Sequence, residues 1–331
     1  SANHNGSIKR AIKTINAAKD CGVNAVKIQT YTPDTMTIDS LNDDFKIDYG
    51  LWKGRTLYEL YGEAFTPFEW HKELFDHANK IGITLFSSPF DESAVDLLES
   101  LNVPAYKVAS FEIIDLPLIK YIAKTLKPMI ISTGMASINE IKDAIDTAKI
   151  NGCKDLILLH CISSYPTPLN EANLQAINTL KKEFKVEVGI SDHTTGYISS
   201  IVATSLGASI IEKHFTLSRS EGGVDSSFSL EPSEMRVLVN NTRLAHLTIK
   251  SDSQIRSSFE DDNKVFRRSL YFVNDINIGE KITKLHVKRI RPGFGIGPKY
   301  YDNVIGSICT KKAKRGDRVT FEHFKSKKLS I

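Results

Sequence analysis

The sequence predicts an α/β protein: a (β/α)8 TIM barrel followed by a small β-rich C-terminal domain. Short apolar, β-branched segments alternate with amphipathic segments at intervals of roughly 20–30 residues, which is typical of repeated βα units. Glycine stands at or near the end of several helical segments, where a left-handed residue is favoured: Gly22, Gly82, Gly152 and Gly207. The alternation stops after about Ser251, so a second domain is expected beyond it.

Strands and helices follow one another in a regular order. The predicted strands are Asn24–Thr30, Ile83–Ser88, Tyr106–Ser110, Met129–Thr133, Leu156–Cys161, Val186–Ser191 and Ser209–His214. The predicted helices are Ile8–Cys21, Pro67–Ile81, Glu92–Leu101, Leu116–Thr125, Ile138–Asn151, Glu171–Phe184 and Ile198–Leu206. An eighth strand, preceding Ser1 and ending near Asn3 and His4, is expected to close a barrel of about 250 residues. A doubly wound open sheet is the alternative, but no glycine-rich phosphate loop follows an early strand.

Three regions are expected along the chain. Residues 1–251 form the barrel, residues 252–265 a polar linker, and residues 266–331 a small domain of short strands and turns. Within that domain, Arg289–Pro298 carries three glycines at alternate positions. Because this segment neither follows a parallel strand nor opens a helix, it predicts a turn-rich loop and not a dinucleotide-binding fingerprint.

Composition narrows the functional class. Hydrophobic residues make up 41% of the 331 residues and charged residues 25%, as in ordinary globular proteins. A net charge of +4, with no basic run that carries interleaved aromatics, argues against nucleic-acid binding. No apolar run approaches the roughly 18 residues of a membrane span, so we expect neither a membrane segment nor a signal peptide. The four cysteines show no CxxC spacing, which predicts free thiols and a cytoplasmic location.

Two apolar segments run into polar tips that end in histidine. The first ends Ser-Asp-His at His193 and the second Glu-Lys-His at His214, 21 positions later. One parallel βα unit has about this length, so both imidazoles are expected in one cleft, with Asp192 and Glu212 alongside. Histidines and carboxylates on adjacent strand ends are typical of a divalent-metal site in an enzyme. Local hydrogen bonding by each histidine is the alternative.

Three lysines lie inside apolar strand segments, namely Lys27, Lys107 and Lys213. A buried lysine is costly unless it is paired or faces a wet cavity. Barrel enzymes work at the C-terminal ends of their strands, so lysines and strand-end hydroxyls there predict a seat for a phosphate and a carboxylate. Each lysine–anion pair at about 4 Å gains roughly 4 kcal/mol of gross Coulomb attraction at an effective dielectric constant near 20.

Two other interpretations of these lysines remain open. Some could be paired within the barrel wall, and one could be the Schiff-base lysine of an aldolase. The histidine pair argues against the aldolase, because Schiff-base chemistry needs no metal.

Ordered motifs along nearly the whole chain resemble those of a known family. They are His4–Gly6, Val26–Gln29, Ser88–Asp91, Tyr106–Ser110, Ser132–Met135, Tyr165–Pro168, Ser191–His193, Glu212–Thr216 and Ser229–Pro232. In these motifs the chain resembles the sialic acid synthases, which condense phosphoenolpyruvate with an amino-sugar aldehyde to give a nonulosonic acid and phosphate. The C-terminal segment resembles the family's antifreeze-like (SAF) domain.

Further segments favour one branch of that family. They are Leu57–Tyr61, Ala64–His71, Ser87–Glu92 and Gly222–Leu230. Here the chain is similar to pseudaminic acid synthases, whose acceptor is an open-chain diacetamido-trideoxy hexose. N-acetylneuraminate and legionaminate synthases are the alternatives within the family.

The resemblance implies roles for individual residues. His193 and His214 are expected to bind a divalent ion, Mn²⁺ foremost, with Mg²⁺ or Co²⁺ as alternatives. Phosphoenolpyruvate is expected to be held by Lys27, Lys107, Ser88, Ser110, Ser132 and Ser191. Gln29, Tyr165 and Asp225 are expected to face the sugar, and Glu212 to orient the attacking water. The expected catalytic residues are Glu212, Asp225 and Lys107.

Two positions differ from the family pattern. The family often has Asn where Ser163 stands. Its acidic residue at the end of the first strand lies upstream of Ser1.

The resemblance of the C-terminal domain also implies a domain-swapped homodimer. In this family the domain crosses to the barrel of a partner subunit and lays an arginine over its sugar, and Arg291 is the matching position. A sugar-binding or antifreeze-like protein without activity is the non-enzymatic alternative. The collection of polar strand-end residues argues against it.

Overall fold

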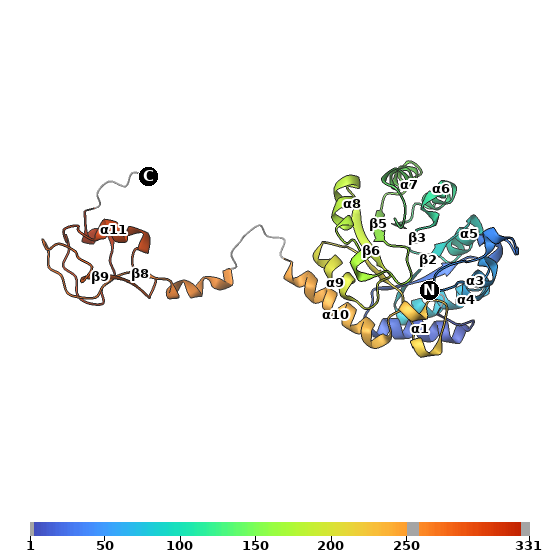
Figure 1. The fold of residues 1–331 in the computed structure, drawn as a ribbon, viewed down its shortest axis with the longest axis horizontal. Helices are drawn as coiled ribbons and strands as arrows, with labels where there is room; N and C mark the ends of the chain where they lie inside the picture. Colours follow the sequence, from blue (N-terminus) through green and yellow to red (C-terminus); the bar gives the residue numbers. More distant parts are fainter. Residues whose placement is uncertain (1–2, 250–257, 326–331) are drawn as a thin grey trace. The chain divides into compact units, whose positions relative to one another are not determined.

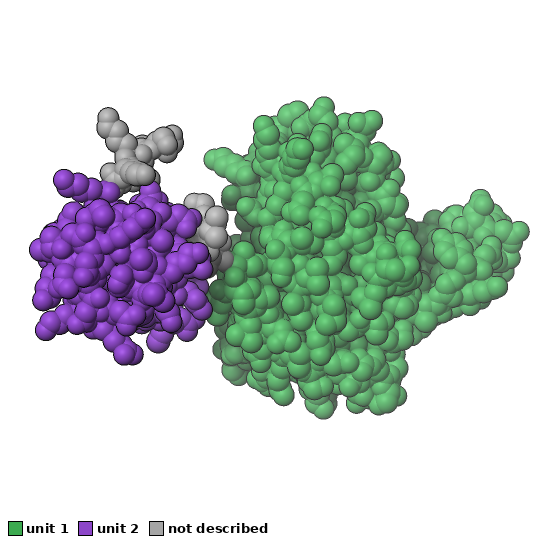
Figure 2. Space-filling view, turned by 60° about the vertical axis from the view of Figure 1, so that its left-hand side comes forward, with its two compact units in different colours: residues 1–250 green, residues 251–331 purple. Residues whose placement is uncertain are grey.

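Two units make up the chain in the computed structural model, residues 1–250 and residues 251–331. They are coloured separately in Figure 2. The structure describes residues 3–249 and 258–325. Within these ranges no helix is both long and apolar enough to cross a membrane.

A sheet of parallel strands forms the centre of the first unit (Figure 1). Its strands in the described residues are β1 (Ala25–Thr30), β2 (Thr84–Pro89), β3 (Tyr106–Val108), β4 (Met129–Ser132), β5 (Leu156–Cys161), β6 (Glu187–Asp192) and β7 (Ile211–Lys213). Each strand pairs with its neighbours in chain order. This order is that of a (β/α) barrel and differs from the doubly wound alternative, whose order reverses at a switch point. The predicted fold class is therefore confirmed.

Most of the predicted eighth strand lies upstream of Ser1. Its predicted end near Asn3 and His4 falls within the described residues, where residues 3–6 form a turn and not a strand. Between residues 3 and 249, β1 and β7 do not pair with each other, so they form the two edges of the sheet.

Helices cover the outer face of this sheet (Figure 1). They are α1 (Ile8–Asp20), α4 (Phe68–Ile81), α5 (Glu92–Ser100), α6 (Leu116–Ala123), α7 (Ile138–Ile150), α8 (Ala176–Phe184), α9 (Ile198–Ser205) and α10 (Pro232–Thr248). Two shorter helices, α2 (Pro33–Met36) and α3 (Leu57–Ala64), follow β1. Each long helix buries an apolar stripe against the strands, as Leu118, Ile119 and Ile122 of α6 illustrate. Gly22, Gly82, Gly152 and Gly207 all have positive φ, as predicted.

The structure corrects the sequence analysis at several helices. The helix predicted from Glu171 begins only at Ala176, because Asn173 has a left-handed φ of 42° and separates α8 from a preceding 3-10 turn. Helices α2, α3 and α10 were not predicted. The start of α10 does carry a signal, since Pro232 stands at its first turn and Glu231 and Glu234 form a capping box.

The second unit has its own core around an antiparallel pair, β8 (Ser269–Phe272) and β9 (Val287–Ile290), with one short helix, α11 (Tyr301–Val304). The alternating glycines allow a loop to pack onto backbone. A Cβ on Gly293 would lie 2.6 Å from the Lys264 carbonyl oxygen, and one on Gly295 would lie 2.4 Å from that of Leu270.

The predicted linker, residues 252–265, is only partly described. Residues 252–257 lie outside the described residues. Residues 258–260 and 262–266 form short 3-10 helices.

Candidate active site

Except for Asp225 and Arg291, the predicted site residues lie on the strands of the first unit or shortly beyond their carboxyl ends, where a barrel carries its chemistry. Residues two apart on a strand share a face, so Lys27 and Gln29 point to the same side of β1. The parallel register places Gln29 beside Ser88 of β2, and Ser191 of β6 beside Glu212 of β7. Strand order thus brings side chains together that are far apart in the sequence.

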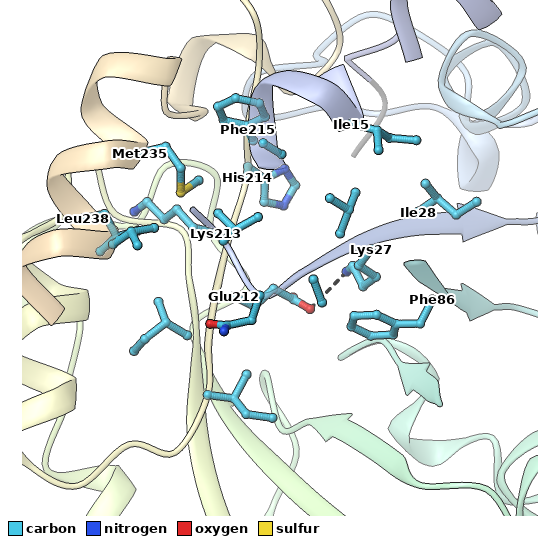
Figure 3. Close-up of a pocket in the computed structure, with 18 of the residues that line it drawn as sticks. Ile15, Lys27, Ile28, Phe86, Glu212, Lys213, His214, Phe215, Met235 and Leu238 are labelled. Atoms are coloured by element: carbon cyan, nitrogen blue, oxygen red, sulfur yellow. Dashed lines mark ion pairs between the residues drawn. The ribbon is translucent and has the colours of Figure 1, made fainter. Parts of the chain in front are cut away.

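Glu212 is the centre of a buried charge cluster. Its carboxylate oxygens lie 3.3 Å from Lys27 Nζ and 3.8 Å from Lys107 Nζ. Ser191 Oγ donates a hydrogen bond of 2.8 Å to the same carboxylate. Figure 3 shows the Lys27 ammonium directed at Glu212. The structure therefore brings these four predicted residues into one contact group.

The charges in this cluster shift each other's pKa values. Burial alone would raise the pKa of Glu212, but Lys107, Lys27 and the Ser191 hydroxyl outweigh it and hold that pKa well below its usual range. Burial lowers the pKa of Lys107 to about 8, although the Glu212 carboxylate opposes the shift. Near neutral pH two ammonium groups therefore face one carboxylate. The surplus positive charge favours an anionic ligand.

The predicted serines supply hydroxyl groups beside this charge. Ser88 Oγ and Ser132 Oγ are buried and have no hydrogen-bond partner. Ser110 Oγ, by contrast, shares a hydrogen bond of 2.8 Å with Ser163 Oγ. A buried polar atom without a partner costs roughly 1–3 kcal/mol, so these hydroxyls are arranged for a ligand that would bond them.

Gly134, just after β4, allows the serine loops to come close. Its φ is +48°, and a Cβ at this position would lie 2.5 Å from Ser110 Cβ and 2.9 Å from Ser163 Oγ. Any side chain here would displace both serines. The dense packing of these loops therefore requires glycine.

The two predicted metal-binding histidines lie side by side. Their ring centroids are 5.3 Å apart. His193 Nδ1 donates a hydrogen bond of 2.9 Å to the Ile162 carbonyl oxygen, which leaves Nε2 as the unprotonated nitrogen. Burial, followed by the neighbouring His214, lowers the pKa of His193 to about 4, so the ring is neutral at pH 7. His214 Nδ1 is buried and lies 3.3 Å from Asp225 Oδ2, without good hydrogen-bond geometry.

These donor atoms fit a divalent cation. Neutral imidazole is a common metal ligand, and the bond from His193 Nδ1 to a carbonyl fixes the ring as in many metal sites. In the part of the chain that the structure describes, no group of three or more His, Cys, Asp or Glu side chains is arranged to hold an ion. A site with two protein ligands leaves coordination positions for water and substrate, as catalysis requires.

Tyr165 and Asp225 flank the histidines. The ring centroid of Tyr165 lies 4.4 Å from that of His193. The Asp225 loop is held by Asn3, whose side-chain oxygen accepts from the Asp225 backbone N–H at 3.3 Å and whose amide donates to Ser229 Oγ at 2.8 Å. Asn3 is not among the predicted site residues, because the sequence marks it only as part of a polar run ahead of α1.

One expectation about this site is wrong. Asp192 was expected beside the imidazoles, but it forms an ion pair of 3.0 Å with Lys213, and both side chains are almost fully buried. Asp192 also accepts hydrogen bonds from the Thr194 backbone and hydroxyl and from Ser200 of α9. It therefore faces the helix layer. Lys213 corresponds to the alternative of a lysine paired within the barrel wall.

The sequence analysis also missed Glu112, which follows β3. Burial raises the pKa of Glu112 to about 7, against the opposing effects of its own backbone N–H and of Lys107. Its Oε2 is buried without a hydrogen-bond partner. A carboxyl group with a pKa near neutrality beside the anion seat can hold or release a proton at working pH.

A cavity of about 1160 Å³ lies between β1 and β7. Most of its lining is apolar, and Ile15 and Leu238 are examples (Figure 3). Lys27, Glu212 and His214 also line it. This space lies between the two edges of the sheet, at the position where the predicted eighth strand would pack.

The remaining predicted residue, Arg291, belongs to the second unit. It is exposed and follows β9, at the start of the glycine-rich loop. Ser269 holds this loop, since its hydroxyl donates to the Pro292 carbonyl oxygen at 2.6 Å and accepts from the Gly295 N–H at 3.0 Å. The arginine is therefore presented from an ordered loop.

Comparison with known proteins identifies the family. The family model described as NeuB family matches residues 14–254. The chain belongs to the NeuB family. The model of the SAF domain matches residues 267–325, in the second unit.

Curated relatives extend over nearly the whole chain. A pseudaminic acid synthase of Campylobacter jejuni is 44% identical over 96% of this chain and 92% of its own length. A pseudaminic acid synthase of Helicobacter pylori is 43% identical over 95% of this chain and 93% of its own length. Among solved structures, an N-acetylneuraminic acid synthetase from Leptospira borgpetersenii in complex with citrate is 31% identical. It superposes with a TM-score of 0.71 over 79% of this chain and 87% of that one.

Proposed function

We propose that this NeuB-family chain is a pseudaminic acid synthase. It condenses phosphoenolpyruvate with an open-chain diacetamido-trideoxy hexose and yields pseudaminic acid and inorganic phosphate. The observation that carries the proposal is the anion seat beside the histidine pair, where Lys27 and Lys107 contact Glu212. The unpartnered hydroxyls of Ser88 and Ser132 stand on the same face of the sheet, two positions beyond the strand partners of these lysines. The relatives named pseudaminic acid synthase support the choice of acceptor.

The reaction forms one carbon–carbon bond and breaks one carbon–oxygen bond. Carbon 3 of phosphoenolpyruvate attacks the aldehyde carbon, and positive charge develops at carbon 2. Water adds to carbon 2 and loses a proton, which gives a tetrahedral hemiketal phosphate. Collapse of this intermediate expels phosphate by cleavage of the carbon 2–oxygen bond and leaves the keto acid. Holding both reactants side by side supplies roughly 7–11 kcal/mol of the lowered barrier.

The chain's own groups bind and orient the reactants. Lys27 and Lys107 neutralise the phosphate and carboxylate, and Ser88, Ser110 and Ser132 donate hydrogen bonds to them. Ser191 would join them by turning its hydroxyl away from Glu212, to which it donates in the free protein. Gln29, Tyr165 and Asp225 hold the sugar. Glu212 stays ionised because of its lysine neighbours, so it can orient the attacking water and stabilise the positive charge at carbon 2. Glu112 can carry a proton near neutral pH.

His193 and His214 would hold a divalent ion, with Mn²⁺ as the first choice and Mg²⁺ or Co²⁺ as alternatives. When bound, the ion would polarise the aldehyde oxygen of the sugar. The neutral state of His193 supports this assignment, since a protonated imidazole cannot bind a metal.

We also propose that a second copy completes the site. Arg291, exposed on its ordered loop, would contact the sugar bound in a partner's barrel within a domain-swapped homodimer.

A cytoplasmic location fits the four cysteines, which are all buried as free thiols.

The decisive experiment measures phosphate release from phosphoenolpyruvate by the full chain with a panel of amino sugars. Release is expected only with an acetamido sugar, fastest with the diacetamido-trideoxy hexose, and it should stop on chelation and return with Mn²⁺. Fastest release with another sugar of the panel would replace the proposed acceptor. Release without any sugar would contradict the condensation. Borohydride trapping of an imine with pyruvate would establish the aldolase alternative.

A further inference from the structure

Trp52 lies in a largely exposed hairpin, residues 46–56, between β1 and α3. The hairpin is closed by a bridge between Lys46 and Thr56. Two apolar side chains close to Trp52 in the sequence are in solvent, since Tyr49 is 84% and Leu51 49% exposed, whereas Trp52 is half-buried. The indole Nε1 instead donates a hydrogen bond of 3.1 Å to the carbonyl oxygen of Val224, the residue before Asp225. The hairpin is thereby tied to the loop that carries a proposed sugar-binding carboxylate.

The same ring extends an aromatic wall that begins at the histidine pair. The centroid of Tyr165 is 4.4 Å from that of His193 and 5.8 Å from that of Trp52. Tyr165 also packs against Phe228, 5.5 Å away between centroids. Because the Trp52 N–H is already used by Val224, the ring offers only apolar surface to a neighbour. A hydroxyl group placed against it would lose its water without gaining a partner.

The reach of the acceptor matches this wall. An open-chain hexose extends about 6 Å from carbon 1 to carbon 6, since each carbon–carbon bond of about 1.5 Å advances the chain by somewhat less than its length. With carbon 1 at the histidines, the far end of the sugar comes level with the Tyr165 and Trp52 rings. In the proposed acceptor that end is a deoxy carbon, a methyl group.

We infer that Trp52 is a specificity-determining residue, which selects acceptors that end in a methyl group over those that end in a hydroxymethyl group. The inference rests on the proposed function and adds to it the residue that reads the far end of the sugar. The two rings would bury the methyl group, whereas a hydroxymethyl group would be left unpaired. An apolar pocket discriminates in this way by roughly 10- to 200-fold.

The test compares two sugars that differ only at carbon 6, a diacetamido-trideoxy hexose and its 6-hydroxy counterpart. For each, kcat/KM is measured with the wild type, Trp52→Phe, Trp52→Leu and Trp52→Ala. The preference for the methyl-ended sugar should fall about tenfold or more in Trp52→Ala, less in Trp52→Leu, and by less than about threefold in Trp52→Phe, which keeps a ring. The KM for phosphoenolpyruvate should not change. Tyr49→Ala, on the exposed side of the hairpin, is the matched control and should leave the preference unchanged.

Each other outcome has a distinct meaning. If both sugars lose the same factor in Trp52→Ala, the indole only anchors the Asp225 loop and the inference is wrong. It is also wrong if Trp52→Phe loses as much preference as Trp52→Ala, because the hydrogen bond to Val224 would then matter and not the ring. If the wild type itself prefers the 6-hydroxy sugar or uses neither, the proposed function fails independently of the variants.

Discussion

Two buried groups of charged side chains, one around Glu212 of β7 and one around Asp192 of β6, differ in whether their polar atoms are all paired. Glu212 faces the barrel interior, and the lysine contacts around it are long, at 3.3 and 3.8 Å, with unpartnered serine hydroxyls nearby. Asp192 and Lys213 face the helix layer and form a pair of 3.0 Å, with hydrogen bonds from Thr194 and Ser200 completing the carboxylate. Both groups place lysine and carboxylate inside a core. Only the Asp192–Lys213 pair, which faces the helix layer, is saturated with hydrogen-bond partners.

This difference separates scaffold from site. A buried pair with every bond made has no use for a ligand, and breaking it leaves an uncompensated charge. The inward cluster has excess cation and excess donors, so its binding capacity is left for something outside the chain. Four predictions follow; the first three run from the largest expected effect on kinetics to the smallest, and the fourth concerns stability.

The largest effect should come from His214→Ala. If the histidines hold the ion, this variant loses several kcal/mol of charge stabilisation, and turnover should fall by about 10³-fold or more. Mn²⁺ binding, followed by electron paramagnetic resonance, should weaken in parallel. His246→Ala, an exposed histidine on α10, serves as the control. Undiminished activity of His214→Ala would refute the metal assignment.

Replacing one lysine from each group gives the sharpest form of the comparison. Lys107→Met should raise the KM for phosphoenolpyruvate by about 100-fold, the value of one strong ionic contact, and should change stability little because Lys27 still pairs with Glu212. Lys213→Met should instead lower the free energy of unfolding by about 3–5 kcal/mol. Its KM should stay near that of the wild type. Denaturant titration measures the free energy of unfolding, and steady-state kinetics measures the KM. A loss of stability in Lys107→Met together with a raised KM in Lys213→Met would contradict the distinction between the two groups.

A smaller effect is expected in the second unit. Arg291→Ala should raise the KM for the sugar by about tenfold and leave that for phosphoenolpyruvate nearly unchanged, since a single exposed contact is lost. Arg289→Ala is the matched control, because that guanidinium lies over the Tyr301 ring within the same unit. Equal changes in both KM values would mean that the unit only stabilises the barrel.

The last prediction concerns stability, pH and Glu112. Its pKa is near 7 in the folded chain and about 4.5 otherwise, so the folded state binds more protons between these values. Stability from this group is therefore complete below about pH 4.5 and declines as pH rises toward 7, by up to about 3 kcal/mol. The unfolding free energy of the wild type minus that of Glu112→Gln should follow this curve. A difference that does not vary with pH would disprove the raised pKa.

Much of the fold could be predicted because each strand and helix carries its own periodicity. The break before α8 could not, since it depends on the left-handed conformation of Asn173. The Asp192 error was avoidable: His193 directly follows β6, and residues two apart in extended backbone share a face, so Asp192 points away from the side of Ser191 and His193. Glu112 and Trp52 lie outside the long helices and strands, where no periodicity of apolar residues indicates which way a side chain points. Their positions follow from tertiary packing alone.

The hydrogen bond from His193 Nδ1 to the Ile162 carbonyl has a consequence beyond the ring itself. Because of this bond, the position of the backbone just after β5 determines the orientation of the imidazole ring. A substitution that shifts this backbone, without touching a histidine or a substrate, would tilt the nitrogen lone pair off its axis. If the two histidines hold an ion, its affinity would thus be changed from a neighbouring loop, and metal preference could evolve while both histidines are kept.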